Sequence, residues 1–342
     1  MGLKGNEGLP GVSTAHIYKQ VLYSFTVMIP GGLEFLALPA FIAGVFLLYK
    51  GSDILVDGTS KTAAHFGVST LIISVIIIAF GTSAPELAIS FGAALQQHAD
   101  ISVGNIIGSC IANLLLVLGI SAVIRPITVQ KSTIKRELPI MIGVTLLFLI
   151  TAFFGLLDAY HIFGGILYLG LFVVFLQFFI SCARKERRPR QRVDEGEMKK
   201  NVLYVIFGIV GVVLGAQLLI ESAVTIATVL GISPMVIALS LVAIGTSLPE
   251  LVVSATASYK KESDIALGNV IGSNVFNIFL ILGACALVIP LNAIASLQNI
   301  ILLLLVSVVM FPLVYFNATI TRAKGVLLLA IYSVFLGYIF VW

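Results

Sequence analysis

Gly81-Thr82-Ser83-Ala84-Pro85-Glu86-Leu87 follows ten residues, 71–80, that are apolar apart from Ser74. The stretch recurs 164 residues later, with one substitution, as Gly245-Thr246-Ser247-Leu248-Pro249-Glu250-Leu251. Each copy puts a proline and a carboxylate where an apolar helix should be most hydrophobic. A chain that does this twice needs a chemical reason for it.

A second signature follows each copy at one fixed distance. It reads Gly104-Asn105-Ile106-Ile107-Gly108-Ser109 in the first copy and Gly268-Asn269-Val270-Ile271-Gly272-Ser273 in the second. Aligned without gaps, residues 81–119 and 245–283 are identical at nineteen of 39 positions. Chance similarity between two leucine-rich segments would not keep Thr, Ser, Pro, Glu and Asn in register. The chain therefore contains an internal repeat.

Composition places this repeat in a membrane protein. Of 342 residues, 59% are hydrophobic and only 11% are charged, and the mean hydropathy is +1.11. In soluble domains about 25% of residues are charged. Since a helix needs roughly 20 apolar residues to cross a bilayer, the apolar runs predict ten transmembrane helices. We expect them at residues 33–56, 70–95, 103–124, 137–154, 159–181, 201–224, 233–258, 265–289, 296–316 and 323–341.

The longest hydrophilic segment between the predicted helices, residues 183–200, divides them into two groups of five. The predicted organisation is a tail at 1–32, a first five-helix repeat at 33–182, a basic loop at 183–200 and a second repeat at 201–342. The apolar patch in the tail is too short to span a bilayer. A poor signal peptide is the alternative reading of the tail.

Lys and Arg alternate between the predicted loops. They occur in the loops after helices 1, 3, 5, 7 and 9, and are absent from those after helices 2, 4, 6 and 8. Because basic residues near helix ends collect on the cytoplasmic side, we expect a multi-pass protein of the cell membrane, with both termini outside and loop 183–200 in the cytoplasm. Each half then has an odd number of spans. The predicted fold is an all-α polytopic membrane protein whose second five-helix repeat is inverted relative to the first.

Glu86 and Glu250 fall near the middle of predicted helices 2 and 7. Ionisable groups at that depth are costly and usually functional. The alternative is a structural carboxylate neutralised by a buried cation. Lys50 is the only Lys or Arg within a predicted span and away from a loop. One cation cannot neutralise both glutamates, and Asp53 is a nearer partner for Lys50.

Pro85 and Pro249 should break helices 2 and 7. Each removes a helical N–H and clashes with the carbonyl four residues earlier, at Gly81 or Gly245. Irregular backbone at membrane depth is tolerated only where it is buried in protein or lines a wet cavity. The freed carbonyls, the hydroxyls and the carboxylates together form the oxygen ligand set of a hard cation such as Ca²⁺. In inverted-repeat transporters such sites lie where the repeats meet.

The second signature has helical periodicity, because polar residues recur every four positions and give each helix one polar stripe. The stripes are Asn105, Ser109 and Asn113, and Asn269, Ser273 and Asn277. Both copies also contain a GxxxG pattern, which lets membrane helices approach closely. We expect the glycines to bring helices 3 and 8 against helices 2 and 7, with the stripes facing the broken segments.

The paired blocks G-T-S-x-P-E and G-N-x-I-G-S-x-x-x-N resemble the two alpha repeats of the cation/Ca²⁺ exchanger superfamily, specifically its Na⁺/Ca²⁺ exchanger branch of prokaryotic type. The blocks cover 78 residues, and the helix layout extends the likeness over residues 33–342. The resemblance implies an antiporter that exchanges Na⁺ for Ca²⁺ by alternating access, without a cofactor. It also implies that helices 1 and 6 slide past the other eight, with Gly51 and Gly215 allowing close contact.

Carried over position by position, the resemblance implies a Ca²⁺ site and flanking Na⁺ sites. The Ca²⁺ site would comprise Thr82, Glu86, Thr246 and Glu250. The Na⁺ sites would comprise Ser83, Ser109, Asn113, Ser247, Ser273 and Asn277, with the carbonyls of Ala79 and Ala243. One departure concerns Asn277, where some relatives, including K⁺-dependent exchangers, have Asp. Asn in both halves argues against K⁺ coupling.

Three other functions remain open. An H⁺/Ca²⁺ or other cation/Ca²⁺ antiporter would use the same scaffold. A cation channel would have no need of inverted, broken helices. An intramembrane enzyme would need a catalytic motif, and the sequence has no HExxH and no Ser with a His base at membrane depth.

Cysteines and charge restrict the partners. Cys110, Cys182 and Cys285 are far apart and lie in or beside apolar runs, so we expect packing residues rather than a disulfide framework or a metal site. The net charge of +4 follows the loop pattern above, which argues against nucleic acid. We expect contact with membrane lipid, and no protein partner is evident.

Overall fold

The computed structural model describes residues 34–185, 195–231, 245–315 and 317–341. The predicted tail, residues 186–194 of the predicted basic loop, the first part of predicted helix 7 and Ala243 lie outside this part of the chain. The described residues are almost entirely helical, with one short pair of strands.

The first half contains the following elements: η1 (Glu34–Leu36), α2 (Ala37–Phe66), α3 (Thr70–Ile73), η2 (Ser74–Ile78), α4 (Ala79–Thr82), α5 (Ala84–Leu95), α6 (Ala99–Ala112), η3 (Asn113–Val117), α7 (Leu118–Ile124), β1 (Ile127–Thr128), η4 (Thr133–Glu137), α8 (Leu138–Phe153) and α9 (His161–Lys185). The second half contains α10 (Glu195–Val229), α13 (Leu248–Tyr259), α14 (Ser263–Val275), η6 (Phe276–Leu282), α15 (Gly283–Ala286), η7 (Ala293–Ser296), α16 (Leu297–Tyr315), β2 (Thr319–Ile320) and α17 (Arg322–Val341). β1 pairs with β2 in antiparallel fashion.

Seven helical stretches of the described residues are long and apolar enough to cross a membrane. An eighth candidate span is bent by 48° between Thr70–Thr82 and Ala84–Leu95. Most observed helix ends lie within a few residues of the predicted ones. Helix α2 differs, since it continues to Phe66 rather than ending near residue 56, and α10 begins at Glu195 rather than residue 201.

Polar contacts explain why α2 is longer than predicted. Its last turns contain the polar residues Asp57 and Ser60, which predicted a loop because they follow the apolar run. In the structure, Asp57 lies 2.8 Å from Lys260 Nζ, and Ser60 Oγ donates to Glu262 at 2.8 Å. The polar face is thus satisfied by the turn between α13 and α14, and the helix continues.

The expected pairing of Lys50 with Asp53 is wrong. The Asp53 carboxylate instead lies 2.5 Å from Lys260 Nζ, whereas the Lys50 ammonium lies over the ring of Tyr49. The reason is that the turn after α13 brings Lys260 alongside α2, and a partner on another element was not visible in the sequence.

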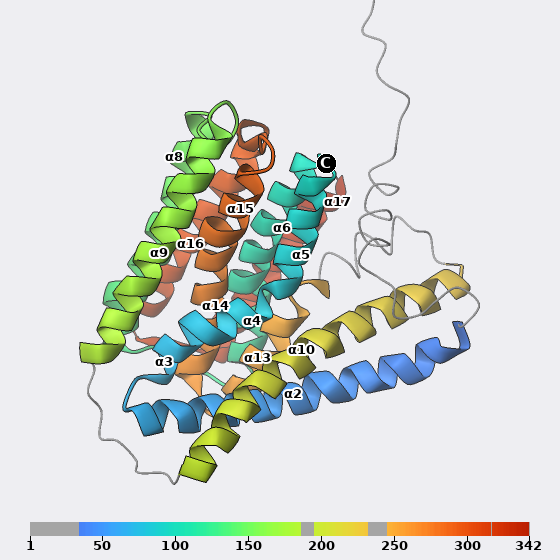
Figure 1. Ribbon diagram of the computed structural model, residues 1–342, viewed down its shortest axis with the longest axis vertical. Helices are drawn as coiled ribbons and strands as arrows, with labels where there is room; N and C mark the ends of the chain where they lie inside the picture. Colours follow the sequence, from blue (N-terminus) through green and yellow to red (C-terminus); the bar gives the residue numbers. More distant parts are fainter. Residues whose placement is uncertain (1–33, 186–194, 232–244, 316, 342) are drawn as a thin grey trace, which may run out of the picture.

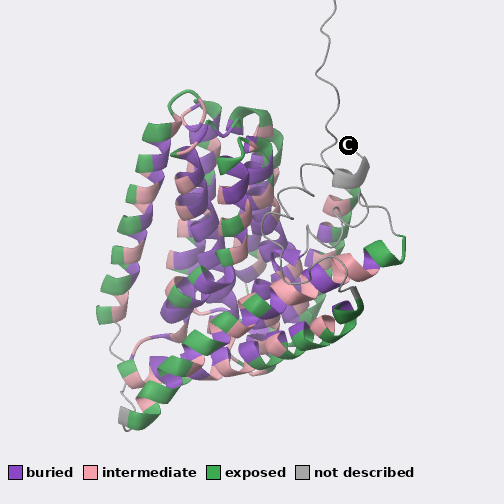
Figure 2. Cartoon of the chain, turned by 45° about the vertical axis from the view of Figure 1, so that its right-hand side comes forward, coloured by how far each residue is buried: buried purple, intermediate pink, exposed green. Residues whose placement is uncertain are grey.

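Burial separates the helices into an inner and an outer group (Figure 2). In the most apolar stretch of Ser263–Ala286, 94% of the residues are buried, and in that of Ala99–Ile124, 78% are buried. In the most apolar stretch of His161–Lys185, only 22% are buried. Large apolar side chains on the outer helices face outward, among them Phe163, Val174 and Phe207. An apolar exterior around a buried polar centre is suited to a lipid surrounding.

Helices α2 and α10 lie side by side and are inclined to the rest of the bundle (Figure 1). Glycines allow this contact. A Cβ added at Gly51 would lie 2.8 Å from the backbone nitrogen of Val212, and one added at Gly215 would lie 2.6 Å from that of Leu48. The expected close approach at Gly51 and Gly215 is confirmed.

Candidate cation site

The two copies of the proline motif have the same local geometry. In the first, α4 ends at Thr82, Ser83 has φ −81° and ψ 7°, and α5 starts at Ala84 with Pro85 in its first turn. In the second, Ser247 has φ −87° and ψ 7°, and α13 starts at Leu248. Each glutamate thus lies in the first turn of a helix, where the unpaired N–H groups and the dipole favour negative charge.

The Glu86 carboxylate is fully buried. It accepts a hydrogen bond at its Oε1 atom from Ser109 Oγ at 3.1 Å. Ser109 in turn contacts the second half, because its Oγ lies 3.4 Å from Thr246 Oγ1 and accepts from Ser247 Oγ at 3.3 Å. Hydroxyls of both halves therefore surround this carboxylate.

The Glu250 carboxylate is also fully buried. Its Oε1 atom accepts hydrogen bonds from Ser83 Oγ and Ser273 Oγ, each at 3.2 Å. The Thr82 hydroxyl lies 3.4 Å from Ser273 Oγ and 2.9 Å from Asn269 Oδ1. Because Ser83 and Thr82 come from the first half, both glutamates belong to one connected cluster.

Several buried oxygens have no hydrogen-bond partner among the described residues. They are Glu86 Oε2 and Glu250 Oε2 in the cluster, and Asn113 Oδ1 and Asn277 Oδ1 on the helices that supply Ser109 and Ser273. Buried polar atoms are normally paired, so these unpartnered acceptors suit a positive partner. Carboxylate and amide oxygens are ligands of hard cations. The described residues contain no group of three or more His, Cys, Asp or Glu that could hold a metal ion.

Ten of the residues predicted for the site are buried, and each is at most 4% exposed. Eight of them are joined by hydroxyl and carboxylate contacts: Thr82, Ser83, Glu86, Ser109, Thr246, Ser247, Glu250 and Ser273. Asn113 and Asn277 lie four residues after Ser109 and Ser273, and donate to Asn274 and Cys110 respectively. The carbonyl of Ala79 accepts from the backbone N–H of Ser83 at 3.0 Å and from the Thr82 hydroxyl at 3.4 Å. Ala243 lies outside the described residues.

The glycine pattern of helix 8 behaves as expected. A Cβ added at Gly268 would lie 2.7 Å from the carbonyl oxygen of Leu71, and one at Gly272 would lie 2.6 Å from that of Val75. Helix α14 thus contacts the segment before the Glu86 motif at backbone distance. For Gly104 and Gly108 of helix 3, no atom of the described residues lies within 4 Å of such a Cβ, so the close contact expected at these two glycines is not observed in the described part of the chain.

Two features of the site were missed in the sequence. Asn113 begins η3, and Asn277 is the second residue of η6, and both segments are π-helical turns, which occur frequently at functional sites. Asn274, which was not singled out, accepts from Asn113 Nδ2 at 3.1 Å. The available signal was a polar residue three positions before Asn277, on the same helix face.

Comparisons with known proteins identify the family of the chain. The sequence matches the family described as sodium/calcium exchanger protein over residues 36–181 and 200–341. It is 32% identical to the sodium/calcium exchanger MaX1 of Methanosarcina acetivorans, over 87% of this chain and 97% of that protein. It is 33% identical to the inner membrane protein YrbG of Escherichia coli, over 85% of this chain and 92% of that protein.

A solved structure of the sodium/calcium exchanger from Methanococcus jannaschii is similar to the fold, with a TM-score of 0.79 and 34% sequence identity. The similarity covers 89% of this chain and 98% of that one. The matches extend over nearly all the described helices and both halves of the buried cluster. The chain therefore belongs to the sodium/calcium exchanger protein family of membrane proteins.

Proposed function

We propose that the protein is a secondary antiporter that exchanges Na⁺ for Ca²⁺ at one site built by Glu86 and Glu250. The observation that carries the proposal is the cluster of unpartnered carboxylate and amide oxygens, fully buried between the two halves. Carboxylate and amide oxygens are ligands of hard cations. The names of the relatives, which are those of exchangers, support the same conclusion and give no support to an enzyme.

The proposed ligands form two groups, one for Ca²⁺ and one for Na⁺. Glu86, Glu250, Thr82 and Thr246 would hold Ca²⁺, whose preference for six to eight oxygens suits two carboxylates and neighbouring hydroxyls. The remaining hydroxyls and amides, with the carbonyls of Ala79 and Ala243, would complete Na⁺ positions around the same carboxylates. Both ions compete for the same negative charge, and competition at one site is what couples their movements.

The charge balance also accounts for exchange rather than leak. Two carboxylates are offset by one Ca²⁺ or by a set of Na⁺ ions. Without a cation, two like charges would lie in a region from which water is largely excluded, where an uncompensated charge costs several kcal/mol. The empty carrier is therefore expected not to reorient, so that each crossing carries an ion.

The proposed architecture has ten spans in two inverted repeats, broken at helices 2 and 7, in the cell membrane with both termini outside. The glycine-lined pair α2 and α10 would slide as a unit past the other helices. Support comes from their backbone contact with each other and their inclination to the bundle (Figure 1). Their motion would expose the cluster to one side of the membrane at a time.

Ion flux into liposomes containing the purified protein tests the proposal. Liposomes loaded with Na⁺ and diluted into Na⁺-free medium should accumulate ⁴⁵Ca²⁺, and those loaded with K⁺ should not. An imposed pH gradient without Na⁺ should also fail to drive uptake. Uptake that follows the pH gradient and ignores Na⁺ would contradict the proposal in favour of H⁺/Ca²⁺ exchange. Uptake without any counter-ion would indicate a channel.

A further inference from the structure

The side chains that hold Asn113 and Asn277 come from matching positions of the opposite half. Asn113 donates from Nδ2 to Asn274 Oδ1 at 3.1 Å. Asn277 donates from Nδ2 to Cys110 Sγ at 3.9 Å. Cys110 and Asn274 are 164 residues apart, which is the repeat distance. Each half thus supplies the group that binds the amide nitrogen of the other half.

The backbone fixes which way the first pair points. Asn274 Nδ2 donates to the carbonyl of Cys110 at 3.3 Å. A carbonyl can only accept, so the amide of Asn274 must present Nδ2 to it and Oδ1 to Asn113. Asn113 must then use its own Nδ2 for that contact. Its Oδ1 is left free of hydrogen bonds, as observed.

In the second pair, Asn277 also donates from its amide nitrogen, but the acceptor is the thiol of Cys110 rather than an amide oxygen. The Cys110 thiol donates to the carbonyl of Asn274 at 3.9 Å, which leaves its sulfur lone pairs to accept from Asn277 Nδ2. Asn277 Oδ1 is again left free. Thiols are weak donors and weak acceptors. The amide of Asn113 is therefore held more firmly than that of Asn277.

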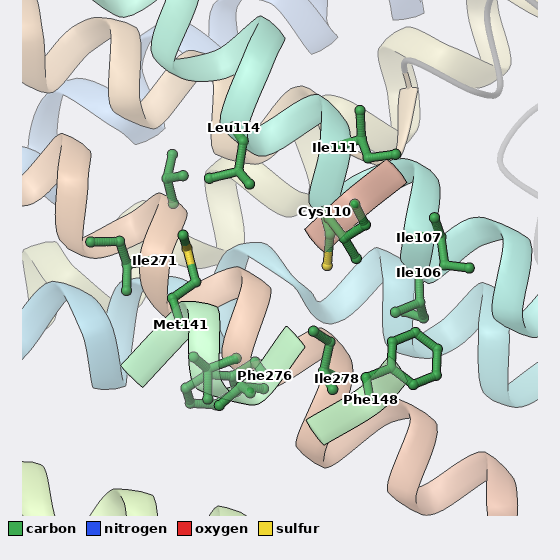
Figure 3. Close-up of a cluster of buried hydrophobic side chains, with 14 of the residues drawn as sticks. Ile106, Ile107, Cys110, Ile111, Leu114, Met141, Phe148, Ile271, Phe276 and Ile278 are labelled. Carbon is green, nitrogen blue, oxygen red and sulfur yellow. The ribbon is translucent and has the colours of Figure 1, made fainter. Parts of the chain in front are cut away.

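Packing alone does not account for Asn274. Its Nδ2 atom lies 3.8 Å from the sulfur of Met141, and Figure 3 shows Met141 and Cys110 in a cluster of buried Ile, Leu and Phe side chains. A buried amide is unfavourable unless it is hydrogen-bonded, and an apolar side chain of similar size would fill the space. The hydrogen bonds of Asn274 to Asn113 and to the Cys110 carbonyl are what distinguish it from Leu.

We propose that Asn274 and Cys110 are positioning residues, which bind the amide nitrogens of Asn113 and Asn277 and so direct both carboxamide oxygens into the cation site. The inference rests on the proposed function, because it assumes that the two oxygens receive a cation. Asn274 acts through Asn113, and Cys110 acts through Asn277. The first contact contributes more to affinity than the second.

A double-mutant cycle on the purified full chain tests the first contact, with Na⁺ as the probe and the Na⁺ concentration that displaces bound Ca²⁺ as the readout. Asn274→Leu should weaken Na⁺ binding by about 10- to 100-fold, as loss of a supporting partner does at metal sites. In an Asn113→Ala background the same substitution should change affinity by less than about twofold, because its target is gone. Equal losses in both backgrounds, or no loss in the first, would overturn the inference.

Further variants keep the test informative if Asn274→Leu folds poorly, as judged by its melting temperature without ions. Asn274→Cys gives this position the side chain found at the matching position of the other half, and should weaken binding by less than Asn274→Leu. Cys110→Ala should weaken binding less again, and only while Asn277 is present. The buried Cys285→Ala variant is the control and should bind as the wild type does. Failure of the wild type itself to bind Ca²⁺ and release it to Na⁺ would refute the proposed function, whereas wild-type Na⁺ affinity in the Asn274 variants would refute only this inference.

Discussion

The two halves of the chain agree closely at the buried cluster. Ser109 donates to Glu86 at 3.1 Å, and its counterpart Ser273 donates to Glu250 at 3.2 Å. One layer further out, Asn105 donates to Ser90 at 2.9 Å and Asn269 donates to Ser254 at 3.0 Å. Every one of these positions is related to its counterpart by the repeat distance of 164 residues. The repeat is therefore kept to the level of single hydrogen bonds in these contacts, whereas Ser83 donates to Glu250 and its counterpart Ser247 donates to Ser109.

The halves differ in how each long helix meets the other half. Helix α2 packs along α13, whereas α10 makes no comparably extensive contact with α5 among the described residues. Lys260 binds Asp53 and Asp57 of α2. Its counterpart in the first half is Gln96, which carries no charge. The difference teaches that a symmetric site can lie in asymmetric surroundings.

Removing either carboxylate should have the largest effect and should break the symmetry of the site. Glu86→Gln and Glu250→Gln should each abolish Na⁺-driven ⁴⁵Ca²⁺ uptake, because one remaining charge cannot balance a divalent ion. Glu197→Gln, an exposed position in α10, is the control and should transport normally. Wild-type uptake by either buried variant would show that the two halves do not act as one site.

Filling the glycine contact of α14 should have the next largest effect. Gly272→Ala should lower the free energy of unfolding by about 1–3 kcal/mol, since the new methyl group would meet Val75 and Ala79 at 2.6 Å. Thermal denaturation in detergent measures this. Gly143→Ala is the matched control, because no atom of the described residues lies within 4 Å of its Cβ. Equal melting temperatures for the two variants would contradict the close contact.

Removing Lys260 should have the smallest effect. It tests the difference between the two halves in how each long helix contacts the other half. Partial burial lowers the pKa of Lys260, but the hydrogen bonds and charges of Asp53 and Asp57 outweigh it and hold that pKa above its usual value. Partly exposed ion pairs contribute at most about 1 kcal/mol. Lys260→Gln should therefore release α2 slightly and increase the population open on the side of the α13–α14 turn.

The measurement is the half-saturating Ca²⁺ concentration on each face of oriented vesicles. Since apparent affinity scales with the population of the competent state, Lys260→Gln should lower the value on the side of the turn and raise it on the other side, by up to about fivefold. Lys261 is the neighbouring residue and its side chain is exposed. Lys261→Gln removes the same charge as Lys260→Gln and should leave both half-saturating concentrations unchanged. Equal shifts on both faces, or matching effects of the two variants, would argue against the contact as a conformational restraint.

Parts of the fold and of the site could be predicted from the sequence, and the other parts depend on contacts between distant residues. The motif around Glu86 predicted a buried functional carboxylate, because a charge in an apolar segment is costly and is usually kept for a function. Local pattern could not predict that α2 continues to Phe66, since its polar end depends on Lys260 and Glu262, about 200 residues away. Nor could it predict the π turns at Asn113 and Asn277, or the role of Asn274, which depends on a contact across the two halves.

The central claim is that two half-sites form one site, and the stoichiometry of Ca²⁺ binding tests it most directly. Isothermal titration of the purified protein, the Glu86→Gln variant and the Glu250→Gln variant should give one Ca²⁺ per wild-type chain, displaced by Na⁺. Neither variant should retain that Ca²⁺ at wild-type affinity. Two Ca²⁺ ions per wild-type chain, with one lost in each variant, would mean two independent sites and would contradict the account.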